Sequence, residues 1–428
     1  MNTRLKLTIT GTVLACAALA PRAALAGGID LYEIATPDVG LASAGYAARA
    51  QDASTVFKNP AGMSLLGSAQ FQGGLQLTYG DVTFSKDVGA TSPLLRGDNN
   101  GGNAIGALPA GSLFFVQPLS DKFAVGMGAL SYFGLAEDFS DGWVGRYYVQ
   151  KGTLLGMSLL PSASFKATDW LSVGAGLNAM YGYFDSKVAV RVPGSSDGLM
   201  QLRDDTWGFG ANAGVLVTPR EGTRLGVTYL SPVKLDFKDT PSFSGLPRGL
   251  SALLDNPSQL NLGMTVPQSV MFSVYQDLNE KWALMANVGW QNWQQFGKVD
   301  VAVESTTGLV ANAAPTTIAL HYQDTWHGAL GAQFKASEAW RLSAGVAYDS
   351  SAVSDANRTL SLPMGEAYRI GVGAEWQVSK AMNLGAAYEF LWAGDMPVTQ
   401  SSAYRGTVSG AFDNAWFSFF TVNLTWKF

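Results

Sequence analysis

Hydrophobic and polar residues alternate singly along most of the chain after residue 68. Within 171–183 the odd positions are apolar or aromatic, while the even positions are small or polar apart from Met180. Within 340–349 the even positions carry the apolar residues instead. A period of two with one apolar face predicts β-strands that lie between two environments. Runs of about ten such residues suit strands that cross a bilayer at a tilt, with the apolar face toward lipid.

The connections between these strands alternate in length. Long segments rich in Gly, Pro, Asn and Ser, such as 85–106, 134–150 and 239–258, lie between short polar ones. The six short connections are 119–122, 167–169, 219–223, 277–281, 335–339 and 378–380. Tight turns at one end and long loops at the other are typical of bacterial outer-membrane barrels. The sequence therefore predicts an all-β fold, a 14-stranded antiparallel transmembrane β-barrel with tight turns and both termini on the periplasmic side.

We expect the strands to begin near residues 69, 107, 122, 151, 170, 203, 222, 259, 280, 315, 339, 365, 381 and 411. Aromatic residues follow several tight turns, namely Phe123, Trp170, Trp282 and Trp340. This is the expected height of an interfacial aromatic belt, although core packing would also place them there.

The C-terminal stretch 420–428 carries an apolar residue at every second position and ends on an aromatic residue. Such an ending resembles the signal by which the barrel assembly machinery recognises its clients. The alternative is an ordinary edge strand, but an exposed apolar edge would promote aggregation of a soluble protein. We therefore expect the barrel assembly machinery as a partner, and outer-membrane lipid and lipopolysaccharide around the barrel.

The N-terminus has the pattern of a secretory signal peptide. Basic Arg4 and Lys6 precede an apolar stretch, and Ala24-Leu25-Ala26 provides a cleavage site, which predicts a signal peptide at 1–26. A rival is lipoprotein processing at Cys16, but the apolar run continues beyond it. Cleavage after Ala26 leaves a chain without cysteine, which excludes disulfides and cysteine nucleophiles.

Composition and charge then narrow the class of protein. Removal of Arg4, Lys6 and Arg22 reduces the 28 basic residues to 25 against 33 acidic ones, a net charge of −8. An acidic protein is a poor candidate for binding nucleic acid. Charged residues are only 14%, against about 25% in soluble proteins, so something other than water covers much of the surface. Since no stretch of about 18 apolar residues follows the signal, a closed barrel is the remaining spanning structure.

The segment 27–68 does not alternate. The stretch 41–50 predicts a short helix, Asp52 and Ser54 are candidates to cap the next turn, and Asn59-Pro60-Ala61 is a turn signal. This segment either hangs in the periplasm or folds inside the barrel as a plug. A barrel of this predicted width has room for one.

A family resemblance becomes specific at this segment. The stretches 27–33, 52–54 and Asn59-Pro60-Ala61-Gly62 resemble the N-terminal hatch of the FadL family, outer-membrane transporters of long-chain fatty acids and other hydrophobic compounds. Further similarity continues in order through 134–135, 143–147, 171–179, 207–210, 229–237, 340–349 and 357–358, and so covers nearly the whole mature chain. The resemblance implies a signal peptide at 1–26, a hatch of short helices at 27–68 and a fourteen-stranded barrel at 69–428.

The resemblance also implies a route for cargo. In the family, external loops capture a hydrophobic ligand, a pocket above the hatch receives it, and a kink in the third strand opens the barrel wall sideways. The hatch turn corresponds to Asn59, Pro60 and Ala61, and the lateral exit to Phe133, Gly134 and Leu135. Gly134 permits the unusual backbone of a bend. The alternative for Gly134 is simply the end of the third strand.

Candidate ligand-binding residues follow from the same resemblance. The capture loop corresponds best to 243–254, where Leu246, Leu250, Leu253 and Leu254 would form an exposed apolar helix face. The alternative is that these leucines pack against neighbouring loops. The loop 192–203 is much shorter than its counterpart in the family's fatty-acid prototype, so a groove between two loops would be shallow or absent.

Three basic residues are candidates for a headgroup ligand: Arg146, Lys187 and Arg191. Arg146 lies in the family-like motif Trp143-Val-Gly-Arg-Tyr147, although it is also a candidate to pair with loop acids. Simple alternation places Lys187 and Arg191 on the outward face of their strand. Loss of a basic partner for carboxylates would suit uncharged cargo such as aromatic hydrocarbons.

Other functions fit the sequence less well. An enzyme would need a nucleophile and base, but His321 and His327 share one face of the tenth strand without a G-x-S-x-G motif or further metal ligands at recognisable spacing. No catalytic residue, metal or cofactor is expected. A general porin needs a charged, open lumen, whereas the predicted inward faces are mostly Gly, Ala, Ser and Asn. A purely structural or adhesive barrel would bind no ligand. We expect a monomeric transporter of hydrophobic small molecules, with long-chain fatty acids or aromatic hydrocarbons as cargo.

Overall fold

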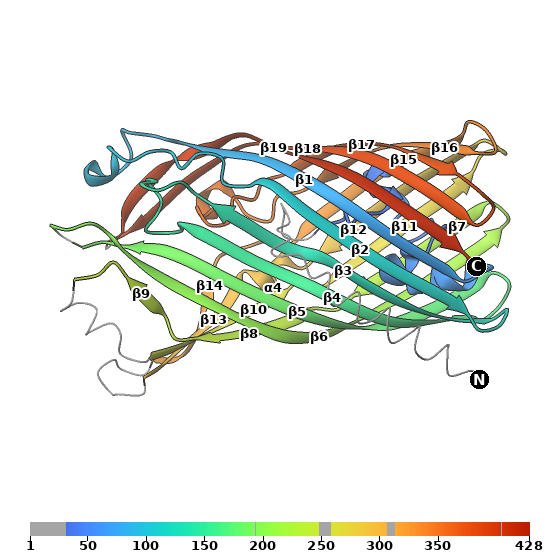
Figure 1. The fold of residues 1–428 in the computed structure, drawn as a ribbon, viewed down its shortest axis with the longest axis horizontal. Helices are drawn as coiled ribbons and strands as arrows, with labels where there is room; N and C mark the ends of the chain where they lie inside the picture. The colour runs from blue at the N-terminus through green and yellow to red at the C-terminus, as the bar shows by residue number, and fades with distance from the viewer. Residues whose placement is uncertain (1–30, 193, 248–257, 306–312, 404) are drawn as a thin grey trace.

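The protein forms a closed antiparallel β-barrel (Figure 1). The computed structural model describes residues 31–192, 194–247, 258–305, 313–403 and 405–428. Within these residues fourteen strands follow one another around the ring, and pairing of β1 with β19 and of β5 with β6 closes it. The ring consists of β1 (Gln70–Lys86), β2 (Gly106–Pro118), β3 (Phe123–Asp138), β4 (Lys151–Lys166), β5 (Leu171–Val190), β6 (Gly198–Arg220), β7 (Thr223–Leu230), β11 (Ser269–Asp277), β12 (Trp282–Gln291), β15 (Thr325–Lys335), β16 (Trp340–Asp349), β17 (Ala367–Gln377), β18 (Met382–Ser402) and β19 (Gly406–Lys427).

The predicted fold class is confirmed, and all six tight connections join neighbouring strands of the ring. The sixth and fourteenth strands begin at Gly198 and Gly406, five residues earlier than predicted. The predicted belt residues are exposed on the barrel surface, with Phe123 and Trp170 each 53% exposed.

Four strands of the ring are interrupted, whereas the sequence pattern predicted continuous strands. Their outer parts form a separate four-stranded sheet of β8 (Val233–Asp239), β10 (Ser258–Val266), β13 (Lys298–Ser305) and β14 (Ala313–Ala319), and β9 (Ser242–Ser244) pairs with β6. Pro232 separates β7 from β8, and Pro267 separates β10 from β11. Proline has no N–H to donate to a ladder, so pairing breaks at these positions. The short helix α4 (Trp293–Phe296) separates β12 from β13.

The polarity of the barrel wall inverts along β1. In its first part the outward residues Leu75 and Leu77 are apolar and exposed, and the inward Gln72 and Gln76 are polar. Beyond Tyr79 the outward positions become Asp81 and Thr83, and the inward positions become buried Val82 and Phe84. Apolar residues face outward only where the outer surface meets lipid, so this inversion marks the outer membrane boundary.

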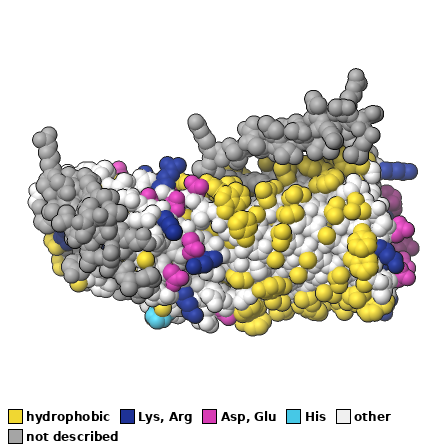
Figure 2. Space-filling view, turned by 90° about the horizontal axis from the view of Figure 1, so that it is seen from below, with side chains coloured by type: hydrophobic (Ala, Val, Ile, Leu, Met, Phe, Trp, Pro, Cys, Tyr) yellow, Lys and Arg dark blue, Asp and Glu magenta, His cyan; other side chains and the backbone are white. Residues whose placement is uncertain are grey.

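The same inversion occurs on the other side of the barrel, across the break at Pro232. Outward residues change from Val227 and Tyr229 in β7 to exposed Lys234 and Asp236 in β8. Figure 2 shows hydrophobic side chains over one part of the barrel surface and charged side chains next to them. The four-stranded sheet therefore stands outside the membrane, with its apolar face turned inward: Leu235 packs over Gly182 of β5 and Gly208 of β6.

The N-terminal segment lies inside the barrel, in the half nearest the C-terminus (Figure 1). It contains the 3₁₀ helices η1 (Pro37–Leu41) and η2 (Pro60–Leu65) and the short helix α2 (Thr55–Lys58). Further 3₁₀ turns, η3 (Pro93–Leu95) and η4 (Asp355–Asn357), lie in outer loops. The helix predicted for 41–50 is wrong, because Ala42, Ser43 and Gly45 have positive φ and residues 42–48 form consecutive turns. No helix in the described part of the chain is long and apolar enough to span a membrane.

Polar wall side chains hold the backbone of this hatch, which we define as residues 31–66. Asn287 accepts a hydrogen bond from the Gly45 N–H at 2.9 Å, and Ser273 accepts one from the Ala47 N–H at 2.9 Å. Buried backbone groups need such partners. At Gly345 of the wall a Cβ would collide with the Leu41 carbonyl, so only glycine allows the hatch this close. The predominance of small inward residues therefore reflects the volume of the hatch.

Buried charges hold the hatch to itself. Asp38 pairs with Arg49 and Lys58, Asp52 pairs with Arg49, and all four side chains are nearly inaccessible. Two acids and two bases balance locally, as buried charges require. Of the two predicted caps, Asp52 accepts the Ser54 N–H at 3.1 Å, whereas the side chain of Ser54, the N-cap residue of α2, makes no cap hydrogen bond.

Candidate functional site

A cavity lies between the hatch and the outer loops. Its empty space is about 950 Å³, counting the open mouth. Leu31 and Tyr32 of the hatch form one side, and residues 362–365 of the β16–β17 loop form part of another. Most of its lining is apolar: Leu31, Val82, Ile105, Leu135, Trp293, Ala352, Leu362, Pro363, Met364, Ala367, Leu391, Ala393 and Phe417. A concave, mainly apolar space with a few polar groups is the usual form of a small-molecule site.

One end of the cavity is polar and charged. Arg369 of β17 donates from Nε to Asp349 Oδ2 at 2.6 Å and from Nη1 to Glu389 Oε1 at 3.2 Å, and it also pairs with Glu33 of the hatch. His327 Nδ1 lies 2.7 Å from Asp349 Oδ1. We call these five residues the Arg369 cluster. It joins the hatch to four neighbouring strands of the wall, β15 to β18.

A β-bulge in β3 lies beside the cavity. Ser131 pairs with Met157 and Phe133 pairs with Gly156, so Tyr132 is the extra residue. An extra residue shifts the alternation of the strand by one position. Phe133 and Leu135 therefore both face inward: Phe133 packs edge-on against Phe296 at 5.8 Å between ring centroids, and Leu135 lines the cavity.

The alternative for Gly134, the end of the third strand, is wrong, since β3 continues to Asp138. The irregular residue of the bulge is Tyr132, directly before the expected kink at Phe133, Gly134 and Leu135. Pairing with Leu155 places Gly134 on the outward face, where a Cβ would lie 3.0 Å from Leu155 Cδ2. The glycine thus leaves space at the outer side of the bulge.

The hatch contacts the bulge directly. The Leu31 N–H donates to the Tyr132 carbonyl at 2.7 Å, and the rings of Phe57 and Tyr132 lie 4.8 Å apart.

Asn59, the predicted hatch turn residue, accepts the Ala61 N–H at 3.1 Å and donates to the Val215 carbonyl of β6 at 3.1 Å. Pro60 begins η2, and Ala61 is fully buried.

Outer loops close the other side of the cavity with an aromatic cluster. The fully buried Trp143 stacks on Phe139 at 3.5 Å between centroids and meets Phe84 edge-on at 6.4 Å. We call this cluster the roof. Its remaining buried members are Val82, Leu95, Ala104, Val144, Tyr147, Val149, Leu360, Met396, Val398, Val408, Phe412 and Ala415.

Arg146 belongs to the edge of this roof. Its Nη1 lies 2.6 Å from Asp98 Oδ2 and its Nε lies 2.8 Å from Asp197 Oδ2. Burial lowers the pKa of Arg146, but its hydrogen bonds to Asp98 and Asp197 raise the pKa above the usual value overall. Arg146 thus ties three outer loops together and is not among the residues that line the cavity.

Comparisons with known proteins agree with this architecture. Residues 17–428 match the family model described as outer membrane protein transport protein (OMPP1/FadL/TodX). The chain belongs to this family. It is 29% identical to outer membrane protein P1 of Haemophilus influenzae, with 87% of each chain covered. It is 28% identical to the long-chain fatty acid transport protein of Escherichia coli K12, covering 90% of this chain and 92% of that protein.

Solved structures of the OMPP1/FadL/TodX type share the fold. A Pseudomonas aeruginosa FadL homologue superposes with a TM-score of 0.82 at 22% identity, covering 94% of this chain and all of that one. The Ralstonia pickettii toluene transporter TbuX gives a TM-score of 0.66 at 18% identity, covering 93% and 100%. The chain is therefore an outer-membrane transport protein and its family is one of transporters.

The other predicted ligand residues of this family member lie at the outer end of the barrel. Lys187 is half-buried beside Gln201 of β6, and Arg191 is exposed just beyond β5. Leu246 follows β9 and packs over Gly198. None of these three lines the cavity. Leu250, Leu253 and Leu254 lie outside the described residues.

The two histidines do not share a strand face as predicted. His321 has a positive φ in the irregular segment between β14 and β15 and is exposed, whereas His327 is buried and packs at a tilt against Tyr32, with 4.3 Å between the ring centroids. No group of three or more candidate metal ligands occurs among the residues that the structure describes.

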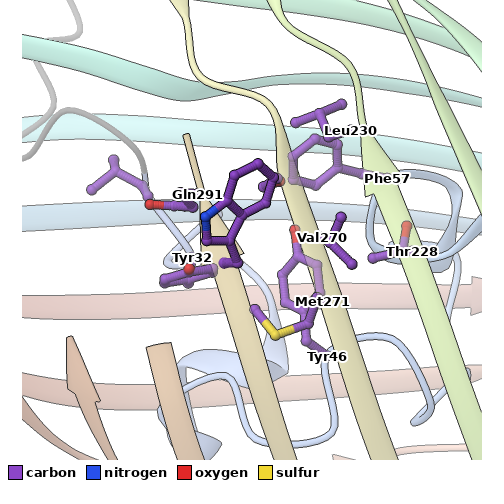
Figure 3. A pocket seen from close by; sticks show the side chains of 11 residues that line it. Tyr32, Tyr46, Phe57, Thr228, Leu230, Val270, Met271 and Gln291 are labelled. Atoms are coloured by element: carbon purple, nitrogen blue, oxygen red, sulfur yellow. The ribbon is translucent and has the colours of Figure 1, made fainter. Parts of the chain in front are cut away.

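A second, smaller cavity adjoins the first. Leu31, Tyr32 and Gln291 line both, so the first hatch residues separate the two spaces. Figure 3 shows Tyr32, Tyr46 and Phe57 of the hatch facing Met271 and Leu230 of the wall. Its wall side consists of residues next to the strand breaks, among them Leu230 at the end of β7 and Ser269 at the start of β11.

Sequence reasoning missed the Arg369 cluster. A signal was present, since Arg369 and Glu389 each interrupt a strand that is otherwise largely apolar, aromatic or small. A charge at an inward position of a barrel strand needs a partner across the lumen. The identity of that partner, Glu33 of the hatch, depends on contacts far apart in sequence.

Proposed function

We propose that this protein takes up hydrophobic small molecules across the outer membrane through the cavity between hatch and roof, and releases them sideways past the β3 bulge. The observation that carries this proposal is an apolar cavity bounded by Leu135, an inward residue of the bulged strand. Lipopolysaccharide is a poor solvent for apolar molecules and a water-filled pore gives them no favourable path, whereas an apolar conduit replaces both.

The relatives indicate two classes of cargo. One is named a long-chain fatty acid transport protein, and a structure of the same fold is named a toluene transporter. Both cargo classes are hydrophobic, and transfer into an apolar cavity gains about 25 cal/mol for each Å² of apolar surface removed from water. We propose long-chain fatty acids or related apolar compounds, with aromatic hydrocarbons as the alternative.

Capture is proposed at the outer ends of β5, β6 and β9. Lys187 of β5 pairs with Gln201 of β6, Gln201 pairs with Ser242 of β9, and Leu246 packs over Gly198 at the start of β6; Arg191 follows β5 at the same end. Leu246 offers apolar surface, and the two bases attract anionic groups to the entrance. Contact with lipopolysaccharide, assembly by the barrel assembly machinery and a monomeric state are parts of the same proposal.

Binding and uptake test this function together. The purified protein in non-ionic detergent is titrated with a fluorescent fatty acid, with toluene and glucose as competitors, and uptake is measured in cells that lack their own transporter. We expect saturable binding that toluene blocks and glucose does not, matched by uptake. Free passage of sugars through reconstituted vesicles without apolar binding would instead make the protein a porin.

Lateral exit is tested at the outer side of the bulge. Gly134→Val adds bulk there, beside Leu155, and Ala129→Val places the same side chain on the outward face of the regular part of β3. We expect Gly134→Val to reduce uptake at least fivefold with unchanged binding in detergent, and Ala129→Val to leave both unchanged. Equal uptake by the two variants would contradict a route past Gly134.

A further inference from the structure

We propose that the cavity between hatch and roof accepts its cargo uncharged, so that an amphiphile enters it as the neutral molecule and its anion is excluded. This inference rests on the proposed function and names the substrate class of the same cavity. It follows from the charges at the polar end of the cavity.

The cavity offers an anion no available cation among its described lining residues. Arg369 and Asp349 are the charged side chains that line it, and Arg369 is already paired with three carboxylates, those of Glu33, Asp349 and Glu389. A carboxylate that leaves water needs a charged or multiple hydrogen-bond partner. An incoming anion would have to compete with three carboxylates for one guanidinium.

The net charge of the Arg369 cluster is not positive in any of the following protonation states. Three carboxyl groups face one guanidinium and the imidazole of His327. Protonation of His327, of one carboxyl group, or of both leaves no net positive charge. The electrostatic potential at this end of the cavity therefore does not favour an anion in any of these states. Electrostatic interactions between charges are strongest where water is excluded.

The packing keeps Arg369 in place. Its side chain is only 8% exposed, and its Cζ lies 5.7 Å from the centroid of the Tyr32 ring. Its partners come from the hatch, β16 and β18, so the guanidinium is held from three directions. Turning it toward a ligand would leave buried carboxylates without a cation, which is strongly unfavourable.

The remaining polar groups of the lining suit neutral cargo. Gln291, Thr325 and Ser350 line the cavity beside the cluster. Gln291 already accepts from Trp293 Nε1 at 2.9 Å. Amide and hydroxyl groups donate and accept hydrogen bonds, so they can pair with a hydroxyl, an ester or a protonated carboxyl group. The apolar remainder accommodates a hydrocarbon chain or ring.

The test compares ligands that share one chain and differ in charge. Hexadecanol and hexadecyl sulfonate displace a neutral fluorescent probe from the purified full-length protein in non-ionic detergent, with micelle partitioning measured separately for each. We expect the alcohol to bind at least tenfold more tightly than the permanent anion. Equal or tighter binding of the sulfonate would overturn the inference. If neither ligand nor toluene binds, the proposed function itself fails.

A charge variant sharpens this test. The double variant Glu33→Gln with Glu389→Gln keeps the length of both side chains and one oxygen of each, but removes two negative charges around Arg369. We expect sulfonate affinity to rise at least tenfold and alcohol affinity to stay within twofold. The matched control is Glu375→Gln, which removes a carboxylate paired with Arg341 at 3.2 Å outside the cavity lining.

The single variant Glu389→Gln covers the case in which the double variant fails to fold, judged by its circular dichroism. Its expected rise in sulfonate affinity is at least threefold. An equal change for sulfonate and alcohol in these variants would contradict the electrostatic exclusion of anions.

Discussion

The hatch and the roof close the same cavity, but the hatch adds many polar contacts with the wall to its apolar packing, whereas the roof is mainly apolar. The hatch backbone is hydrogen-bonded to polar wall side chains such as Gln76 and Asn287, and its charges are paired in the interior. The roof instead packs Trp143 on Phe139 among buried apolar side chains. Water can replace a hydrogen bond at a net cost of about 1 kcal/mol, whereas it cannot replace apolar burial.

This difference in contacts indicates whether the hatch or the roof opens first. A hatch held by polar contacts can move once water reaches it, because its hydrogen bonds are exchangeable. A dry aromatic roof resists hydration until it opens as a unit. We therefore expect the hatch to be the side that responds to single polar substitutions, and the roof to respond to the loss of one aromatic anchor.

The largest effect is expected at the charged link between hatch and wall. Arg369→Leu leaves Glu33 and Glu389 buried without their cation, a loss of about 3–5 kcal/mol. We expect release of the hatch, measured as increased ion conductance in planar bilayers. Arg341→Leu is the control, because Arg341 is 42% exposed, forms its ion pair with Glu375 of the wall, and reaches the hatch through one long hydrogen bond of 3.5 Å to Gln51. Equal conductance of both variants would contradict the role of the Arg369 cluster.

Trp143→Ala should have the next largest effect, confined to the roof. Removing this fully buried side chain costs about 3 kcal/mol, because a cavity replaces its contacts with Phe139. Hydrogen exchange of residues 87–105 and 139–150 should accelerate while the barrel strands stay protected. Trp170→Ala, at an exposed belt position, should leave loop exchange unchanged. Faster hydrogen exchange in the hatch but not in these loops would show that Trp143 stabilises the hatch and not the roof, against the prediction.

Loss of one wall side chain that holds the hatch should have a smaller effect. Gln76 accepts the Ala35 N–H at 3.2 Å and donates to the Glu33 carbonyl at 3.1 Å. Gln76→Ala removes both bonds and should cost about 1 kcal/mol or slightly more. The measurement is faster hydrogen exchange at Ala35 with an intact roof. Gln70→Ala, on the same face of β1 and with a side-chain oxygen that meets no partner, should change it less.

Arg146 should give the smallest effect. Its ion pairs with Asp98 and Asp197 are partly exposed, so Arg146→Ala should loosen the loops by about 1 kcal/mol, and less in 1 M salt. Ligand affinity should stay within threefold of the wild type. A tenfold loss of affinity with unchanged loop protection would make Arg146 a ligand residue after all.

Local patterns were sufficient for the barrel. Period-two alternation and the six polar turns predict the number and order of strands, because each strand meets lipid on one face along its whole spanning length. The broken strands escaped prediction because the phase of alternation changes at Pro232 and Pro267, and a shifted pattern still resembles a strand. The inversion from Tyr79 to Val82 is visible in the sequence only once the direction of lipid is known.

The interior was less predictable. Hatch turns at Ala42 and Ser43 adopt positive φ against local preference, because wall side chains and close glycines determine the path of the backbone. The kink of the third strand was expected at Phe133, Gly134 and Leu135, whereas the extra residue of the bulge is Tyr132, directly before them. The cavity and the Arg369 cluster depend on residues more than 300 positions apart, such as Glu33 and Arg369.

The most direct test of the account is uptake of a neutral hydrophobic compound after the cavity is filled. Ala352 is buried in the lining, so Ala352→Trp places an indole ring in the space, while Ala336→Trp adds one at an exposed tight turn. In cells lacking their own transporter, we predict at least a tenfold loss of toluene or hexadecanol uptake for Ala352→Trp alone, with the barrel intact. Undiminished uptake by a folded Ala352→Trp protein would contradict transport through this cavity.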